Sequence, residues 1–273
     1  MAVATSGRVE LWYDIQGEGE PLVLTGGFGI LHEQFHLVTP ILAKHFKVIN
    51  WNWRGAGRSD RAQTQDYSIE VWTQDLRAVL DAAGVNRAYL WSTSTGSLIG
   101  IHFTARYPER VRALITYPYF KTDLELRRVY QCYQHIFDVF GWDGITRILS
   151  WIGLPEERLN SEEGTAFAKW ERECLERSLS PGSFNKMCQA YEYVDLTSDL
   201  PRLRSVPVLL LAGRDGPLGL GIPMIQRLAS QFLETVSSAK THVIEGSGGT
   251  YCMLEKPEET ALAVINYLNG LAK

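Results

Sequence analysis

Short apolar segments alternate along this chain with segments whose apolar residues recur at helical spacing, and this alternation constrains the fold more than any other feature. Such alternation favours a mostly parallel, twisted sheet flanked by helices, an α/β architecture. We expect an opening antiparallel pair formed by Val9–Ile15 and Leu22–Thr25. The other expected strands are Val48–Trp53, Ala88–Ser92, Ala113–Tyr117, Val208–Ala212 and Thr241–Glu245.

The strand pattern is interrupted between residues 120 and 200. This part of the chain contains amphipathic stretches broken by glycine and proline, which is typical of helices. The predicted helices are Leu124–Phe140, Ile145–Ile152, Gly164–Ser178 and Ser183–Tyr193. We therefore expect a core domain made of residues 1–119 and 201–273, with residues 120–200 inserted as a helical cap.

One expected strand runs directly into a helix, with Ser94 at the turn between them. A sharp strand-to-helix turn needs small residues two positions before and after its apex, because the two backbones approach closely there. Ser92 and Gly96 meet this need, so the pattern is S-x-S-x-G. This arrangement indicates a nucleophilic serine. The alternative is that Ser94 only caps the helix, since serine is favoured at that position.

Five further segments carry a resemblance to a known family. They are Pro21–Gly29, Asn52–Asp60, Tyr107–Val111, Val206–Gly213 and Leu254–Glu258. Together with the turn at Ser94, they make the chain resemble the α/β-hydrolase superfamily over nearly its whole length. The resemblance implies a nucleophile elbow at Ser94 and an oxyanion hole formed by the backbone N–H groups of Phe28 and Thr95.

The resemblance also implies a catalytic acid and a histidine, and this chain departs from the pattern at both positions. Gly216 stands where the acid is expected, and Asp215 precedes it by one residue. The position of the histidine falls on Gly249 or Thr250, and the nearest histidine, His242, lies inside an expected strand. Asp215 is therefore a candidate acid if the loop shifts by one residue, and a solvated turn residue otherwise.

Two other histidines, His32 and His36, follow the expected oxyanion loop. Imidazole titrates near neutral pH and suits proton transfer, so either could act on a substrate if it faced the cavity. The alternative for each is a surface or packing role. We take His32 as the candidate catalytic acid or base and His36 as a candidate substrate contact.

The predicted cap is rich in aromatic residues, which favours an apolar cavity above Ser94 with a few hydroxyl donors. A small hydrophobic organic molecule is the expected ligand. The candidate substrate-binding residues are Gly27, His36, Tyr117, Tyr133, Phe137, Trp142, Gly216, Thr250 and Tyr251.

Composition and motifs exclude several other classes of function. The net charge of −4 and the lack of a basic run argue against nucleic acid as a partner. No apolar stretch is long enough to span a membrane and no leader pattern is seen, so we expect a cytoplasmic protein, a monomer or a homodimer. The sequence shows no phosphate loop and no metal-ligand spacing, so no cofactor or metal is expected.

Three functions remain open from the sequence. The first is a non-hydrolytic enzyme of the lyase, isomerase or cyclase type, in which Ser94 and the oxyanion hole stabilise an enolate or alkoxide. The second is a serine hydrolase, esterase-like or lactonase-like, with a triad rearranged to use Asp215 and a histidine from the loop containing His32 and His36. The third is a ligand-binding protein without catalysis. The non-hydrolytic enzyme is the main expectation.

Overall fold

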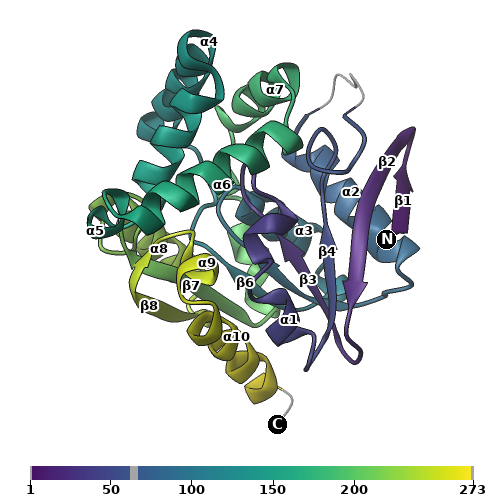
Figure 1. The fold of residues 1–273 in the computed structure, drawn as a ribbon. Coiled ribbons are helices and arrows are strands. Elements are labelled where there is room, and N and C mark those ends of the chain that lie inside the picture. The colour runs from purple at the N-terminus through teal and green to yellow at the C-terminus, as the bar shows by residue number, and fades with distance from the viewer. Residues whose placement is uncertain (1, 62–66, 272–273) are drawn as a thin grey trace.

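A single eight-stranded sheet forms the centre of the molecule in the computed structural model, which describes residues 2–61 and 67–271 (Figure 1). The strand order is β1-β2-β4-β3-β5-β6-β7-β8, and every neighbouring pair from β4 to β8 is parallel. The predicted α/β architecture is confirmed. The strands are β1 (Ala2–Ser6), β2 (Val9–Gln16), β3 (Pro21–Thr25), β4 (Lys47–Trp51), β5 (Ala88–Ser92), β6 (Val111–Thr116), β7 (Val208–Asp215) and β8 (Lys240–Gly248).

The predicted pairing of Val9–Ile15 with Leu22–Thr25 is wrong. The antiparallel partners of β2 are β1 and β4, whereas β3 lies between β4 and β5 and is parallel to both. The strands β1 and β2 are joined by a tight turn, in which Gly7 has a φ of 64°. A left-handed backbone of this kind suits glycine, and it closes a hairpin at the edge of the sheet.

Helices cover both faces of the sheet. Successive residues of a strand point to opposite faces, so a strand made only of apolar residues needs a partner layer on each side. Leu90 of β5 packs in one apolar cluster, while its neighbours Tyr89 and Trp91 pack in another. The first cluster includes residues of α2 (Ile69–Ala82), α3 (Gly96–Arg106) and α8 (Pro223–Thr235). The second includes residues of α1 (Thr39–Leu42), α9 (Cys252–Glu255) and α10 (Pro257–Leu271).

Four helices lie between β6 and β7 and gather at one end of the sheet (Figure 1). They are α4 (Leu124–Gly153), α5 (Glu156–Leu159), α6 (Glu162–Ser178) and α7 (Pro181–Tyr191). Two of the predicted helices form the two halves of α4, which bends at Gly141, where φ is 57° and ψ is −147°. That residues 120–200 form a domain separate from the core stays a prediction.

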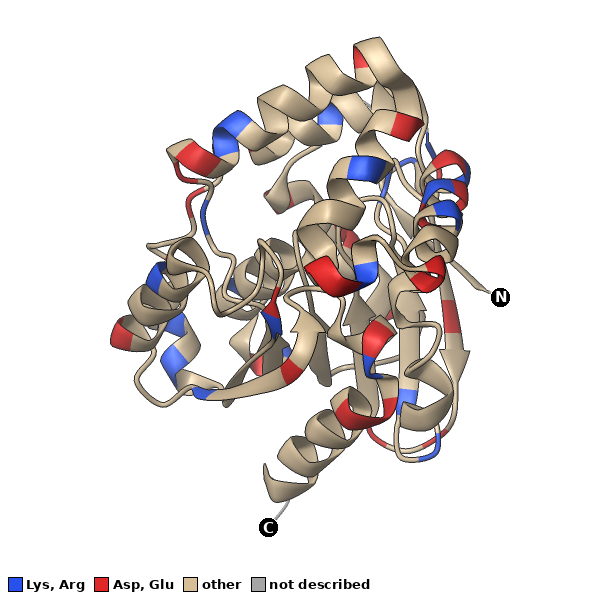
Figure 2. Cartoon of the chain, turned by 60° about the vertical axis from the view of Figure 1, so that its left-hand side comes forward, with Lys and Arg blue, Asp and Glu red and all other residues tan. Residues whose placement is uncertain are grey.

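Three short 3₁₀ turns complete the described chain: η1 (His32–Phe35), η2 (Pro108–Arg110) and η3 (Leu200–Ser205). Basic and acidic residues are interspersed along the helices, as Figure 2 shows. Among the described residues, no helix combines the length and the apolar character that a membrane crossing requires.

Candidate active site

Ser94 lies at the apex of a strained turn between β5 and α3. Its φ is 52°, and within residues 2–61 and 67–271 no other non-glycine residue has a positive φ. A backbone of this kind costs about 1–3 kcal/mol and persists only where the surrounding structure enforces it. The Ser97 N–H donates to the carbonyl of Ser94 at 3.0 Å, so α3 starts immediately after the apex. The predicted elbow geometry at Ser94 is thus present.

The small residues around Ser94 are required by close backbone approach. A Cβ atom added to Gly96 would lie 2.6 Å from the carbonyl oxygen of Thr25. One added to Gly100, a turn later in α3, would lie 2.7 Å from the Cβ of Ser92. Real Cβ atoms do not approach other atoms so closely, which explains why α3 carries glycine at two positions facing the sheet.

The loop after β3 touches Ser94 directly. A Cβ atom at Gly27 would lie 2.6 Å from the Cβ of Ser94, so only glycine fits between them. The two proposed oxyanion donors, Phe28 and Thr95, line the same cavity as Ser94. In the described part of the chain their backbone N–H groups donate to no other residue. Both groups are therefore available to a substrate oxygen, and their role stays a prediction.

Gln34, which the sequence did not single out, holds this loop in place. It is 1% exposed, its side-chain oxygen accepts from the Gly27 N–H at 2.8 Å, and its amide donates to the carbonyl of Thr250 at 2.8 Å. Because the Gly27 N–H is bonded to Gln34, it cannot donate to a substrate, and the N–H of Phe28 is the next backbone donor of the loop. Because Thr250 lies 216 positions away along the chain, no local sequence pattern indicates this bridge.

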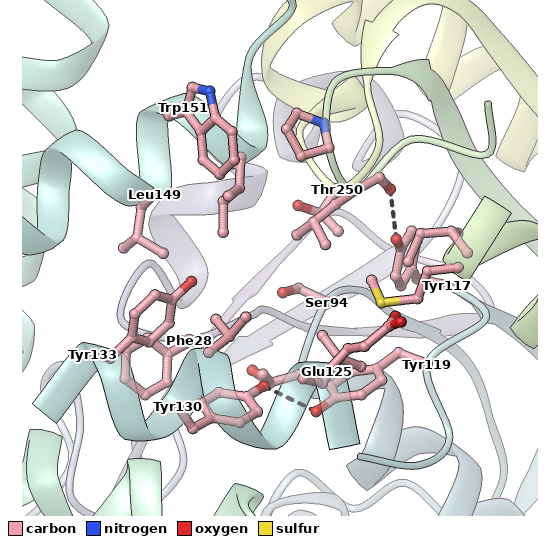
Figure 3. A pocket seen from close by; sticks show the side chains of 18 residues that line it. Phe28, Ser94, Tyr117, Tyr119, Glu125, Tyr130, Tyr133, Leu149, Trp151 and Thr250 are labelled. Atoms are coloured by element: carbon pink, nitrogen blue, oxygen red, sulfur yellow. Dashed lines mark hydrogen bonds between the residues drawn. The ribbon is translucent and has the colours of Figure 1, made fainter. Parts of the chain in front are cut away.

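A cavity of about 240 Å³ opens above Ser94, between the sheet and the helices that follow β6 (Figure 3). Its walls are mainly apolar and aromatic, with hydroxyl groups from tyrosines and threonines. Of the predicted contacts, Tyr117, Tyr133 and Thr250 line it. The full lining is Phe28, Ser94, Thr95, Tyr117, Tyr119, Glu125, Leu126, Val129, Tyr130, Tyr133, Leu149, Trp151, Ile152, Pro217, Leu218, Met224, Ile225 and Thr250.

The tyrosines of this cavity are buried hydrogen-bonding groups. The hydroxyls of Tyr119 and Tyr130 lie 2.9 Å apart, and the hydroxyl of Tyr117 donates to the carbonyl of Leu218 at 2.5 Å (Figure 3). Burial raises the pKa of Tyr119 to about 12 and raises the pKa values of Tyr117, Tyr130 and Tyr133 as well. At neutral pH these phenols stay protonated, so they cannot act as bases. The proton of Tyr117 is already donated to Leu218, whereas the hydroxyl of Tyr133 can donate to a substrate.

The structure places two predicted aromatic contacts outside this cavity. The ring of Phe137 packs against Trp142 at 4.6 Å and against Phe184 at 4.7 Å between centroids. These rings join α4 to α7, so packing between helices explains them better than contact with a substrate. Gly27 and Tyr251 line a smaller hollow of about 30 Å³ that also reaches Ser94.

His32 is held in a different part of the structure from Ser94. Its Nδ1 accepts from the side-chain amide of Asn52 at 3.0 Å, and its ring lies 4.4 Å from that of Trp12. Burial, and then the nearby Arg58 guanidinium, lower the pKa of His32 to about 4. The expected position of His32 facing the cavity is therefore not found, because η1 directs this side chain toward Asn52.

The remaining candidates also lie away from the cavity. His36 is exposed, and its ring lies 5.3 Å from that of Trp170, tilted by 39°. Asp215 ends β7, and its carbonyl accepts from the Gly249 N–H at 3.1 Å, but its side chain is not part of the cavity wall. Among the described residues that line the cavity, none is a histidine. The structure thus does not bring Ser94, Asp215 and a histidine together.

Backbone geometry disfavours an aspartate at position 216 and a histidine at position 249, two of the positions where the family resemblance places the acid and the histidine. Gly216 has a φ of 72°, which an aspartate would adopt only with strain. A Cβ atom at Gly249 would lie 2.8 Å from the backbone nitrogen of Gly219, so position 249 has no room for a histidine. Thr250 does line the cavity beside Ser94 (Figure 3), so position 250, unlike position 249, has a side chain that borders the cavity.

A buried carboxyl group, also missed by sequence analysis, lies close to this loop. Glu171 of α6 is 0% exposed; it accepts from the hydroxyl of Ser150 at 2.7 Å and from the hydroxyl of Tyr251. Burial raises its pKa to about 7. Glu171 therefore connects two helices that follow β6 to the loop after β8. No group of three or more metal-ligating side chains is found in the part of the chain that the structure describes.

Comparison with known proteins places this geometry in a family. The model of the α/β hydrolase fold family matches residues 22–249. A putative carbamate hydrolase, RutD, of Azorhizobium caulinodans is 29% identical over 219 residues, which are 80% of this chain and 82% of that protein. The 2-hydroxy-6-oxo-2,4-heptadienoate hydrolase of Pseudomonas putida is 32% identical over 113 residues, which are 40% of this chain and 41% of that protein.

Solved structures agree with the family assignment. The crystal structure of the enol-lactonase from Burkholderia xenovorans superimposes with a TM-score of 0.83 at 20% identity and covers 98% of this chain and 100% of that chain. This likeness shows the fold. Because the family model spans most of the chain, the protein belongs to the α/β-hydrolase family.

Proposed function

We propose that the protein is a serine hydrolase of small apolar esters or lactones with a good leaving group, and that Ser94 acts without a histidine. One observation carries the proposal: the strained Ser94 and two free backbone donors face an apolar cavity in which no described lining residue is a histidine. These are the parts that acyl transfer needs, apart from the base.

The non-hydrolytic reaction expected from the sequence is wrong. The curated relatives are named as hydrolases, and the chain belongs to the α/β-hydrolase family. The rearranged triad of Asp215 and a histidine from the loop containing His32 and His36 lacks geometric support, because none of these residues lines the cavity of Ser94. Hydrolysis by Ser94 itself is the reading that agrees with both the relatives and the geometry.

The missing histidine restricts the substrates. In an ordinary triad the imidazole accepts the serine proton and later donates it to the leaving alcohol. Without it, the Ser94 oxygen attacks the carbonyl carbon while its proton passes to water, and the leaving group departs as an anion. The backbone N–H groups of Phe28 and Thr95 would stabilise the oxyanion of the tetrahedral intermediate. Only a phenolate or an enolate leaves readily under these conditions, so aryl and enol esters are the expected substrates.

The cavity wall supports an uncharged acyl group. Apart from Glu125 at the start of α4, the lining residues carry no charged side chain, and Glu125 lies 3.4 Å from Arg227. The phenol hydroxyl of Tyr133 offers a donor to a carbonyl or ether oxygen of a bound substrate. The hydroxyls of Tyr130 and Tyr119 donate within the protein, because Thr122 already donates to the carbonyl of Tyr191. Together these features favour a compact, apolar molecule with one or two oxygen acceptors.

The accumulation of an acyl-enzyme tests the proposal. Deacylation also needs a base to activate water, so the ester of Ser94 should form faster than it is hydrolysed. We expect a burst of phenol from phenyl butyrate and a butyryl adduct on the intact protein, both abolished in Ser94→Ala. Thr93→Ala, which changes the preceding hydroxyl, should keep the adduct. If the wild-type protein forms no adduct and releases no phenol, the proposal is wrong and a binding role would replace it.

A further inference from the structure

A pocket separate from the cavity of Ser94 lies where three elements meet: η1, the turn after β4, and the end of α6. Its volume is about 480 Å³, and it shares no lining residue with the Ser94 cavity or with the small hollow beside it. We call it the arginine pocket; its lining residues are His32, Glu33, Gly57, Arg58, Arg61, Arg177 and Ser178.

Positive charge dominates the arginine pocket. Arg58, Arg61 and Arg177 all line it, and none of them forms an ion pair with a carboxylate of the described chain. The Arg58 guanidinium lies over the ring of Trp12 at 4.8 Å, which leaves the N–H groups at its edge open to a ligand. Three arginines around one hollow repel one another, and Glu33, the single carboxylate of the pocket, compensates only part of this repulsion.

The two other titratable residues of the pocket, His32 and Glu33, leave an excess of positive charge. The Arg58 N–H donates to the side-chain oxygen of Asn52 at 3.0 Å, so the amide of Asn52 must face His32. Nδ1 of His32 therefore acts as an acceptor, and the ring is neutral at pH 7. Glu33 is the single carboxylate of the pocket, and the three arginines outnumber it.

A buried hydroxyl group gives a second, independent indication of a ligand. Ser178 is 1% exposed, and its Oγ has no hydrogen-bond partner among the described residues, yet Ser178 lines the pocket. A buried hydroxyl normally finds a partner, because leaving it unpaired costs about 1–3 kcal/mol. An oxygen atom of a ligand in the pocket would satisfy it.

We propose that the arginine pocket binds a phosphate group, either as inorganic phosphate or on a small phosphorylated metabolite. The planar guanidinium groups present pairs of N–H donors that match phosphate oxygens, and Ser178 adds a hydroxyl donor. A bound phosphate would join Arg177 of α6 to Arg58 of the turn after β4. It would thereby add to the backbone bond between the Gly57 N–H and the Ser178 carbonyl, which is 2.8 Å long.

Calorimetry and thermal unfolding test this site without any ester substrate. Inorganic phosphate and glycerol 3-phosphate are titrated against potassium chloride at constant ionic strength. We expect at least one of them to bind the wild-type protein and to raise Tm, because a ligand of the folded state stabilises it. The Arg58→Gln/Arg177→Gln variant should bind at least about tenfold more weakly. Arg202→Gln, an exposed change in η3, should bind like the wild type.

The pattern of binding decides between the two sources of phosphate and can overturn the site. Binding of inorganic phosphate alone indicates free phosphate, and tighter binding of glycerol 3-phosphate indicates a metabolite. If the double variant does not fold, Ser178→Ala and Arg177→Gln alone should each weaken binding. The proposal is wrong if neither anion binds, or if every variant responds as strongly as the wild type. Failure of Ser94 to hydrolyse esters would leave this result unaffected.

Discussion

Gln34 accepts a hydrogen bond from the backbone N–H of Gly27 at 2.8 Å, and this contact positions the loop that faces Ser94. The amide of the same side chain donates to the carbonyl of Thr250, so one buried residue ties together two loops of the site. The free N–H of Phe28 follows Gly27 directly, and its direction depends on this contact.

Gln34→Ala should destabilise the protein and impair the reaction. It leaves the Gly27 N–H and the Thr250 carbonyl without partners in the core, at a cost of about 1–3 kcal/mol for each buried group. We expect a lower free energy of unfolding and a fall in kcat/KM for phenyl butyrate of at least about tenfold. Gln74→Ala, on the exposed face of α2, serves as the control. An unchanged kcat/KM in Gln34→Ala would show that the loop does not need this bridge.

The glycines of α3 allow a matched test of the elbow. Replacing a helical glycine by alanine ordinarily stabilises a helix by up to about 1 kcal/mol. Gly270→Ala in α10 should behave in this way, because nothing lies within 4 Å of the added Cβ atom. Gly100→Ala should instead destabilise the protein, because its Cβ atom would lie 2.7 Å from the Cβ of Ser92. Urea unfolding of both variants measures the difference, and equal effects would contradict the close packing of β5 and α3.

Glu171 predicts a specific dependence of stability on pH. Burial raises its pKa from 4.5 to about 7, so between these values the folded state holds a proton that the unfolded state has lost. The stabilisation that the protonated Glu171 gives to the folded state is complete below pH 4.5 and is lost as pH rises through 7. The free energy of unfolding of the wild type relative to Glu171→Gln should therefore fall by up to about 3 kcal/mol from pH 5 to pH 8.

Glu173→Gln provides the control for this measurement, because Glu173 is exposed on the same helix. Its stability relative to the wild type should not vary with pH over the same range. A pH-independent difference between the wild type and Glu171→Gln would mean that Glu171 does not retain its proton in the folded protein.

Thr250→His should supply the base that the site lacks. Position 250 lines the cavity of Ser94, whereas position 249 has no room for a side chain. We expect kcat/KM for an alkyl ester to rise by about tenfold or more, with a pH dependence that shows an inflection near 6.5. Thr250→Asn, which offers a polar side chain without an imidazole, should not gain activity. If both variants behave alike, position 250 cannot deliver a proton acceptor to Ser94.

The sequence predicted most of the core and the elbow because both depend on local patterns. Buried parallel strands appear as short apolar runs, and the turn at Ser94 needs small neighbours at fixed spacing. The sequence does not reveal the edge strand β1, because its five residues form no apolar run. Without β1, the sequence pattern pairs β2 with β3. Partners of strands in a sheet are set by packing over long distances, which the pattern of one segment does not reveal.

The predicted site was less accurate because it depends on where side chains point. His32 follows the oxyanion loop closely in sequence, yet η1 turns it toward Asn52. Gln34 and Glu171 contribute through contacts with residues 216 and 80 positions away, respectively. Contacts of this kind follow from the tertiary structure. Ser94, Phe28 and Thr95 could be identified because their positions are fixed relative to one strand-to-helix turn and one loop.

The dependence of rate on the leaving group tests the central claim most directly. Phenyl butyrate and cyclohexyl butyrate have the same acyl group and leaving groups of similar size, but only phenol departs readily as an anion. Without a histidine to protonate the leaving oxygen, kcat/KM for the phenyl ester should exceed that for the cyclohexyl ester by at least about a thousandfold, and Ser94→Ala should abolish the difference. Similar values for the two esters, with a bell-shaped pH profile, would show that a general acid is present and would contradict this account.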